Sequence, residues 1–217
     1  MNSALVPIKG LDAGKSRLMS VLPRSAIEAL SLAMLGDVLG ALAKVPEIDH
    51  TVVVTPDADV GKAAEEAGAE AMLLATLGLN ASLDEAARLL ADRGLERLLV
   101  LLGDVAGAGA SDLHELFVAQ EALGQPPAAV LAPSSDGGTA ALLRAPYDAI
   151  PSCFGGGSAA AHEQAAAAAG VPFRRCLLPS LAIDLDHPDD LEALLASDAP
   201  ARRTRALLGE LGIGTPK

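Results

Sequence analysis

The sequence predicts an α/β protein of Rossmann-like architecture, in which helices cover both faces of a mostly parallel β-sheet. Short aliphatic runs alternate with helical patterns along the whole chain, as in proteins built from strand–helix–strand units. Hydrophobic residues make up 51% of the 217 residues, yet only three Phe and one Tyr are aromatic, so the core must be aliphatic. Because no internal repeat or linker interrupts the alternation, we expect a single domain over residues 1–217.

The predicted strands are short runs of aliphatic or β-branched residues, most of them ended by Gly, Pro or a polar residue. The most β-branched run is Thr-Val-Val-Val-Thr at 51–55, and the most apolar is Leu-Leu-Val-Leu-Leu at 98–102. In chain order, strands are expected over residues 4–8, 51–55, 71–74, 98–102, 128–132, 140–143 and 182–185.

The predicted helices have apolar residues at a spacing of three and four, together with start and stop signals. Capping boxes, in which a Ser and a Glu three residues later pair with backbone N–H groups, are expected at Ser25 and Ser82. Gly68 stops one helix, Ser111 is expected to cap another, and Pro188 fits a first turn. In chain order, helices are expected over 25–44, 57–67, 82–94, 111–123, 158–169, from 188 onward and 200–211, with turns at 78–80 and 136–139.

The formal net charge of −12 limits the classes of partner. An acidic surface repels phosphate backbones and few aromatic rings are available for stacking, so we expect no binding to nucleic acid polymers. We also expect no membrane span or signal peptide, because Pro7, Lys9 and Lys15 interrupt the N-terminal apolar run. Two isolated cysteines, Cys153 and Cys176, fit reduced thiols, and we expect a cytoplasmic protein whose apolar helix faces permit a homodimer.

Three cations follow the first predicted strand: Lys9, Lys15 and Arg17. In an acidic chain, this concentration of positive charge in a glycine-containing loop favours binding of a triphosphate through backbone N–H groups and side-chain charges. A solvated basic loop is the alternative. Gly10 to Ser16 superficially resembles a P-loop, but only three residues separate its first glycine from Gly-Lys-Ser, where a P-loop has four. We therefore exclude the P-loop.

Three aspartates are candidate metal ligands. Asp104 follows the strand at 98–102 and Gly103, at the edge where α/β sheets bind ligands, although it could equally cap a loop or helix. Asp184 and Asp186 are two apart in a run that we expect to be extended, so their side chains project to the same face. Two neighbouring carboxylates repel unless a cation relieves them, and a divalent metal does so with oxygen ligands. In the alternative interpretation, Asp186-His-Pro-Asp-Asp only caps the next helix.

Two glycine loops carry hydroxyl groups that could meet an oxyanion. Gly155-Gly-Gly-Ser158 precedes a helix whose N-terminus offers free N–H groups, and the turn at 136–139 ends in Thr139. His162 lies one turn into the helix that begins at residue 158, and it is expected either to contact a phosphate or to lie on the surface. The scattered histidines argue against a zinc site, and no Ser–His–Asp set stands out. Chemistry without a protein nucleophile, such as nucleotidyl transfer, therefore fits best.

The order of these motifs resembles the guanylyltransferases of coenzyme F-420 biosynthesis, which use 2-phospho-L-lactate, phosphoenolpyruvate or 3-phosphoglycerate. The resemblance spans residues 6–191 and is carried by a series of short motifs. They are Val6-Pro-Ile-Lys9, Gly14-Lys-Ser-Arg-Leu18, Gly78-Leu-Asn80, Asp104, Asp136-Gly-Gly-Thr139, Phe154-Gly-Gly-Gly-Ser158 with His162, and Asp184-Leu-Asp186-His-Pro-Asp-Asp-Leu191.

The resemblance implies a three-layer nucleotidyltransferase fold of the glycosyltransferase-A type. It also implies GTP as donor, Mg²⁺ as cofactor, pyrophosphate as leaving group and a small phosphorylated carboxylic acid as acceptor. Lys15, Arg17 and Asp104 would be the catalytic residues. The binding roles carried over by position are, for the metal, Asp104, Asp184 and Asp186; for the acceptor, Thr139, Gly155 and Ser158; and for the nucleotide, Lys9, Lys15 and Arg17, with Asn80 near the base.

Two positions depart from the family pattern. The family has Asp-Leu-Pro after its middle strand, whereas Asp104 is followed by Val-Ala-Gly, so the loop loses the stiffness of proline. Gly-Gly-Thr is followed by Ala140 instead of Asn or Thr, which predicts the loss of a polar side chain near the acceptor. Two alternatives stay open. One is a sugar-phosphate or molybdopterin nucleotidyltransferase, or a glycosyltransferase, of the same fold, and the other is a non-catalytic nucleotide-binding relative.

Overall fold

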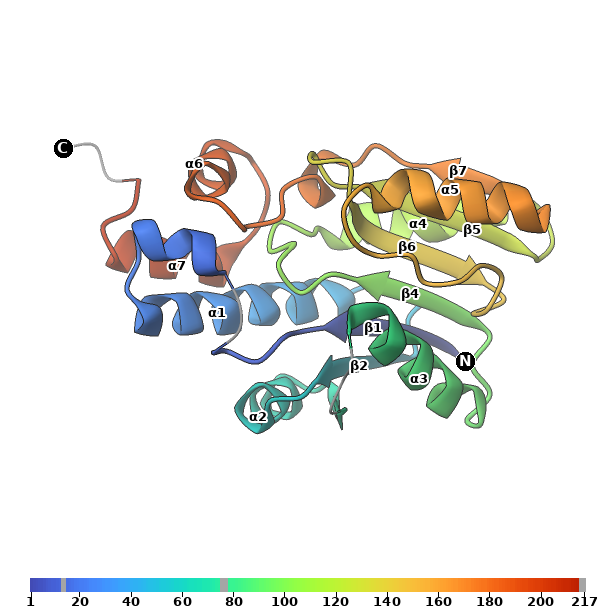
Figure 1. The fold of residues 1–217 in the computed structure, drawn as a ribbon, viewed down its shortest axis with the longest axis horizontal. Helices are drawn as coiled ribbons and strands as arrows, with labels where there is room; N and C mark the ends of the chain where they lie inside the picture. The colour runs from blue at the N-terminus through green and yellow to red at the C-terminus, as the bar shows by residue number, and fades with distance from the viewer. Residues whose placement is uncertain (13–14, 75–77, 215–217) are drawn as a thin grey trace.

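The centre of the protein is a seven-stranded sheet, seen in a computed structural model that describes residues 1–12, 15–74 and 78–214 (Figure 1). The strand order is β3-β2-β1-β4-β6-β5-β7. β6 runs antiparallel to its two neighbours, β4 and β5, and the other strand pairs are parallel, which confirms the predicted mostly parallel sheet. The strands are β1 (Asn2–Pro7), β2 (His50–Thr55), β3 (Glu70–Leu73), β4 (Arg97–Leu101), β5 (Ala128–Pro133), β6 (Thr139–Ala145) and β7 (Phe173–Arg175).

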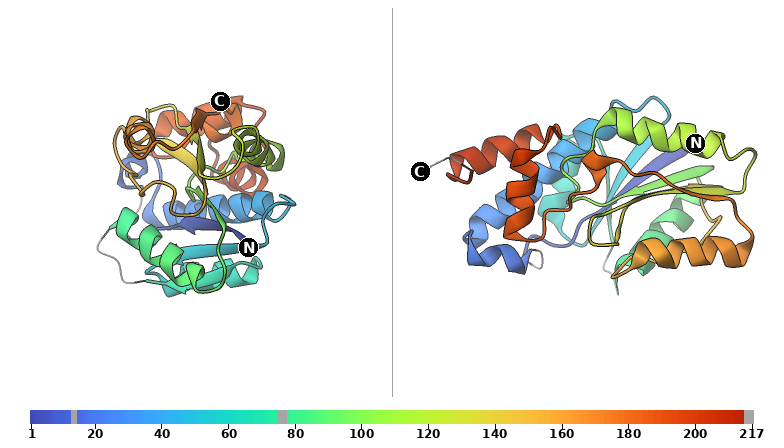
Figure 2. Two further views of the ribbon diagram at one scale, coloured as in Figure 1. Left: turned by 90° about the vertical axis from the view of Figure 1, so that its right-hand side faces the viewer. Right: turned by 90° about the horizontal axis from the view of Figure 1, so that it is seen from above.

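Helices cover both faces of the sheet, as predicted (Figure 2). The helices on one face are α1 (Arg24–Leu42), α2 (Ala58–Glu66) and α4 (Ala110–Glu121), and those on the other are α3 (Leu79–Ala91) and α5 (Ser158–Ala169). A helix layer, the sheet and a second helix layer make up the three-layer architecture. Parallel strands end on the same side of a sheet, so the loops after β1, β2 and β4 meet at one edge.

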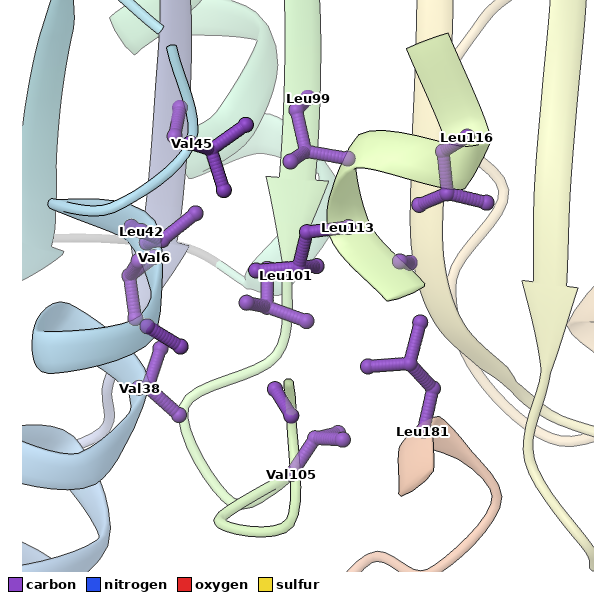
Figure 3. Packing of buried hydrophobic residues seen from close by; sticks show 14 of the residues in the cluster. Val6, Val38, Leu42, Val45, Leu99, Leu101, Val105, Leu113, Leu116 and Leu181 are labelled. Carbon is purple, nitrogen blue, oxygen red and sulfur yellow. The ribbon is translucent and has the colours of Figure 1, made fainter. Parts of the chain in front are cut away.

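The core between α1, α4 and the sheet is aliphatic (Figure 3). Val38 and Leu42 of α1 lie near Val6 of β1, and Leu113 of α4 lies near Leu101 of β4. By length and composition alone, an 18-residue window of α1 could cross a membrane, but half of that window is buried inside the protein. In this fold α1 is therefore a core helix.

A third apolar cluster lies beyond the carboxyl ends of β1 and β4, where α6 (Pro188–Ala196) and α7 (Arg202–Glu210) follow in the chain (Figure 1). Leu194 of α6 and Leu208 of α7 share this buried cluster with Leu30 of α1. The 3-10 helix Ser16–Ser20 adds Leu18 to it. The cluster thereby packs the segment after β1 against the C-terminal helices α6 and α7, next to the edge of the sheet.

Three predicted helix starts are wrong because each helix begins earlier. α1 and α4 each begin one residue before the expected cap, so Ser25 and Ser111 lie inside the first turn. α3 begins at Leu79, so the expected turn there is helical from that residue on. Ser82 donates its hydroxyl to the carbonyl of Gly78, four residues earlier, instead of capping the helix.

The expected strand at 182–185 is also wrong. Its backbone hydrogen bonds go to two loops, from Ser135 N–H to the Ala182 carbonyl and from Leu185 N–H to the Asp104 carbonyl. The run is apolar because it is partly buried, and burial alone does not require a strand. The sheet instead ends at β7, a three-residue edge strand with two exposed arginines that pairs with β5.

Candidate active site

The loops after β1, β2 and β4 and the turn that opens β6 surround a pocket of about 770 Å³. Nine of the ten residues predicted for the site line this pocket. They are Lys9, Lys15, Arg17, Asp104, Thr139, Gly155, Ser158, Asp184 and Asp186. They form three chemical sets: cations after β1, carboxylates after β4 and before α6, and hydroxyl groups with a glycine around β6 and α5.

The loop after β1 is tied to α2 by Asp57. One carboxylate oxygen caps α2 by accepting hydrogen bonds from the N–H groups of Asp59 (2.9 Å) and Val60 (3.3 Å). The other oxygen accepts from Leu11 N–H (2.9 Å), which is the main reason that the pKa of Asp57 lies below its ordinary value. The helical pattern predicts a helix from residue 57 but neither this cap nor the second bond, which fixes the basic loop. Residues 13–14 of the loop lie outside the described residues.

Lys15 and Arg17 contact the carboxylates directly. The Lys15 ammonium lies 2.7 Å from Asp104 Oδ2 and 3.9 Å from Asp186 Oδ1, and its side chain is 10% exposed. The exposed Arg17 guanidinium pairs with the other oxygen of Asp186. Lys15 has a φ of 57°, a left-handed conformation that costs a non-glycine residue about 1–2 kcal/mol. The Lys15 side chain thus lies mostly buried against carboxylates, whereas Lys9 and Arg17 are exposed, so the loop is solvated in part.

Asp104 and Asp184 bring two negative charges together at the pocket. Burial raises the pKa of Asp184 above its ordinary value, and the neighbouring charge of Asp104 raises it further. Asp104 Oδ1 is buried and has no hydrogen-bond partner among the described residues. Within the described ranges no three His, Cys, Asp or Glu side chains are arranged to hold a metal, and the Lys15 ammonium binds Asp104 Oδ2 instead. The clustered carboxylates and the unused oxygen nevertheless suit a hard cation.

The segment from Asp186 to Asp190 also caps the next helix, as in the alternative interpretation, but it does so through Asp190. Asp190 Oδ2 accepts hydrogen bonds from the backbone N–H groups of Asp186 (2.9 Å) and His187 (2.6 Å) at the start of α6. Asp184 and Asp186 both line the pocket. They do so from an irregular segment, so the expected alternation of a strand is not what brings them together.

Asn80 is the predicted site residue that does not line the pocket. Its amide pairs with the backbone of Phe154, because Nδ2 donates to the carbonyl (3.0 Å) and Oδ1 accepts from the N–H (2.8 Å). This pair fixes the start of the glycine loop to α3, while the neighbouring Leu79 and Ser82 line the pocket. Gly155, which follows, has a φ of 140° that favours glycine.

The turn before β6 is held by Asp136. Its Oδ1 accepts hydrogen bonds from the Ser134 hydroxyl (2.6 Å) and from Gly138 N–H (2.8 Å), and these bonds lower the pKa of the carboxyl. A Cβ at Gly138 would lie 2.6 Å from Ser134 Oγ and 2.8 Å from Asp136 Oδ1, so a side chain there would displace these two hydrogen-bonded groups. The turn delivers Thr139, the first residue of β6, to the pocket.

His162 is fully buried and does not line the pocket, so both expectations for it are wrong. Its Nδ1 lies 3.1 Å from Thr139 Oγ1, and its Nε2 lies 2.9 Å from the backbone nitrogen of Cys153. Ser158 Oγ lies 3.0 Å from the same Thr139 oxygen. Burial, followed by the charge of Arg144, lowers the pKa of His162 to about 4, so the ring is neutral at pH 7.

The two departures from the family pattern lie in packed surroundings. Val105 and Ala106, which follow Asp104, are buried, and a Cβ at Gly107 would lie 2.8 Å from the Ser180 carbonyl oxygen. The loop after Asp104 is therefore held by packing instead of by proline. Ala140 is fully buried in the apolar cluster on the α1 face, so the expected loss of a polar group near the acceptor is wrong.

A family model described as "Guanylyl transferase CofC like" matches residues 2–215. A phosphoenolpyruvate guanylyltransferase from Sphaerobacter thermophilus is 38% identical over 202 residues, which cover 91% of this chain and 93% of that protein. A 3-phospho-D-glycerate guanylyltransferase from Colwellia psychrerythraea is 31% identical over 196 residues, which cover 90% of this chain and 92% of that protein.

Among solved structures, CMP:2-keto-3-deoxy-manno-octonic acid synthetase complexed with CTP matches this chain with a TM-score of 0.60. The match covers 97% of this chain and 99% of the synthetase at 13% sequence identity, so it concerns the fold alone. It confirms the predicted nucleotidyltransferase fold.

Proposed function

The chain belongs to the CofC-like guanylyltransferases, and we propose that it transfers GMP from GTP to a small phosphorylated carboxylic acid in coenzyme F-420 biosynthesis. The proposed acceptors are phosphoenolpyruvate, 3-phosphoglycerate and 2-phospho-L-lactate, and relatives are named for the first two. The pocket carries the proposal, because it combines a cationic loop, clustered carboxylates and a wall of hydroxyls and glycine. Each set suits one part of the reaction.

The cationic loop suits the triphosphate of GTP. Lys9, Lys15 and Arg17 gather positive charge at one place in a protein of net charge −12, which concentrates an anionic substrate there. Lys15 and Arg17 are paired with Asp104 and Asp186. A triphosphate would compete for these cations and release the carboxylates.

The set of hydroxyl groups and a glycine around β6 and α5 suits the acceptor. Thr139 and Ser158 supply hydroxyl groups, and Gly155 lets the backbone approach a ligand closely. The N-terminus of α5, which begins at Ser158, adds the positive end of a helix dipole. Phosphate and carboxylate oxygens both accept hydrogen bonds from such donors.

In the proposed reaction an oxygen of the acceptor phosphate attacks the α-phosphorus of GTP. A phosphorus–oxygen bond forms there as the bond from the α-phosphorus to the bridging oxygen of the β-phosphate breaks, and its electron pair leaves with pyrophosphate. The protein positions both substrates and stabilises the negative charge that develops on the phosphoryl oxygens. We assign this role to Lys15 and Arg17, which ion pairs with Asp104 and Asp186 hold at the pocket before the substrates bind.

Mg²⁺ is the proposed cofactor, and Asp104, Asp184 and Asp186 would hold it. The free oxygen of Asp104 and the raised pKa of Asp184 support a cation at this place. When bound, Mg²⁺ neutralises charge on the triphosphate.

Pyrophosphate release tests the proposal. The protein is incubated with GTP, Mg²⁺ and each of the three acceptors, with CTP and glucose 1-phosphate as control donor and control acceptor. We expect release that requires GTP and one of the acids. Release with glucose 1-phosphate would indicate a sugar-phosphate nucleotidyltransferase, and no release with any acid would refute the proposal.

Two further measurements address the metal and the non-catalytic alternative. Asp184→Ala and Asp186→Ala should abolish turnover while the melting temperature stays close to that of the wild type. Thermal-shift measurements should show stabilisation by GTP that depends on Mg²⁺. Stabilisation that is indifferent to Mg²⁺, without turnover, would favour a nucleotide-binding relative.

We also propose a cytoplasmic location, because Cys153 and Cys176 are both free thiols. A homodimer remains a prediction, for which size-exclusion chromatography with light scattering is the direct measurement.

A further inference from the structure

The contacts of His162 determine which of its nitrogens carries the proton. Nε2 lies 2.9 Å from the backbone nitrogen of Cys153, and a backbone N–H can only donate, so Nε2 must accept. A neutral imidazole has its single proton on the other nitrogen, so Nδ1 is the donor. Nδ1 lies 3.1 Å from Thr139 Oγ1.

The tautomer decides how the two pocket hydroxyls use their protons. Thr139 and Ser158 have one hydroxyl proton each, and the bond of 3.0 Å between their oxygens uses one of the two. Because His162 supplies the proton in its own bond to Thr139, the second hydroxyl proton stays unused. With the opposite tautomer, Thr139 would donate to Nδ1 and Ser158 to Thr139, and the wall would present only lone pairs.

We propose that His162 is a positioning residue, whose Nδ1–H bond to Thr139 leaves the Thr139–Ser158 pair one hydroxyl proton to donate to the anionic acceptor. The inference rests on the proposed function, in which the acceptor lies against these two hydroxyls. An anion needs donors, and a wall of lone pairs would repel it. His162 thus sets acceptor affinity without touching the acceptor.

The surroundings of the ring hold it in this state. Arg144 is buried and donates from its guanidinium to the Ile150 carbonyl (2.9 Å), which anchors the segment leading to Cys153. The Phe154 ring packs edge-on against His162, with centroids 4.9 Å apart. The Cys153 N–H group, which donates to Nε2, is therefore held in place through the buried Arg144 side chain.

Nitrogen NMR of ¹⁵N-histidine-labelled protein tests the tautomer without any substrate. The chain has four histidines, so the His162→Asn spectrum assigns the His162 signals by difference. We expect a protonated, pyrrole-type Nδ1 and an unprotonated, pyridine-type Nε2 at neutral pH. A protonated Nε2 would overturn the inference and leave the proposed function untouched.

Three variants test the consequence for the acceptor. His162→Ala removes both contacts, His162→Gln can reach only towards Cys153, and His162→Asn keeps an N–H donor near Thr139. We expect the acceptor KM to rise about tenfold or more in the Ala and Gln variants, as for loss of a hydrogen bond to a charged group, and less in the Asn variant. The KM for GTP should stay unchanged in all three.

A double-mutant cycle separates this role from mere packing. In Thr139→Val the hydroxyl is gone, so His162→Ala should raise the acceptor KM no further in that background. Fully additive effects, or an Asn variant as impaired as the Gln variant with both folded, would overturn the inference. If the wild type released no pyrophosphate, the proposed function would fail, and the NMR tautomer and the affinity for phosphoenolpyruvate measured by calorimetry would still judge the role of His162.

Discussion

Replacing Lys15 by Met should strengthen binding of divalent cations by the free enzyme and weaken its activity. The Lys15 ammonium lies 2.7 Å from Asp104 Oδ2 and 3.9 Å from Asp186 Oδ1, so a positive charge already occupies the proposed metal site. Met has a similar length and no charge. It therefore removes the competing cation and keeps most of the packing of a side chain that is only 10% exposed.

The magnitude follows from the ion pair. Two unit charges 2.7 Å apart attract by about 6 kcal/mol at an effective dielectric constant of 20. Desolvation of both groups offsets most of this, which leaves a net value of about 1–2 kcal/mol. Without the competitor, affinity for Mn²⁺ or Mg²⁺ should rise about five- to thirtyfold. Turnover of GTP should fall about 100- to 1000-fold, as for loss of one donor that stabilises developing charge.

Calorimetric titration of the free enzyme with Mn²⁺ and pyrophosphate release measure the two effects. Lys62→Met is the matched control, because this exposed lysine of α2 pairs with Glu66 on the same helix, and it should change neither quantity. Metal affinity in Lys15→Met equal to or below that of the wild type would refute the competition between Lys15 and the metal. Unchanged kcat/KM for GTP would refute its role in catalysis.

Three other predictions concern charge, pH and stability. Asp104→Asn should lower kcat about 100-fold or more, measured by pyrophosphate release, and return the pKa of Asp184 towards its ordinary value, measured by NMR titration. The His162 pKa of about 4 in the fold, against 6.5 when unfolded, adds stability that is fully present above pH 6.5 and is lost as the pH falls towards 4. Urea titrations should show a loss of about 3 kcal/mol over this range that His162→Asn does not share, and equal losses would contradict it. Arg205→Ala should lower the melting temperature by about 4–8 °C, because its guanidinium donates to carbonyls at the end of α6, whereas the exposed Arg202→Ala should not.

The parts of the fold that could be predicted are those that depend on residues close together in the sequence. The run at 98–102 is wholly apolar and ends in a glycine, so β4 and the position of Asp104 at the sheet edge follow from the sequence. The same logic fails at 182–185, where an apolar run is buried between loops. The prediction also fails at β7, an edge strand that contains two exposed arginines and therefore has no apolar run. In both cases the neighbours of the segment decide its structure, and they lie far away in the chain.

The site shows the same division. Lys15, Asp104 and Thr139 could be predicted because each follows or precedes a strand at the binding edge. The pairing of Asn80 with the Phe154 backbone joins residues 74 apart, and no local signal marks it. His162 lies four residues after Ser158, about one helical turn into α5. That helix is rich in alanine on every side, however, and its sequence does not indicate which face is buried.

Because β6 is antiparallel to its neighbours, its first residue, and not its last, lies at the pocket. The proposed nucleotide side of the pocket lies where β1 and β4 end, whereas Thr139, on the proposed acceptor side, lies where β6 begins, just after the turn at 134–138. A residue gained or lost in that turn would slide β6 by one place and exchange Thr139 for Gly138 or Ala140 at the pocket. The same change would leave β1, β4 and their loops in place. In the proposed function, the length of this one turn would therefore alter the acceptor side of the pocket and leave the GTP side unchanged.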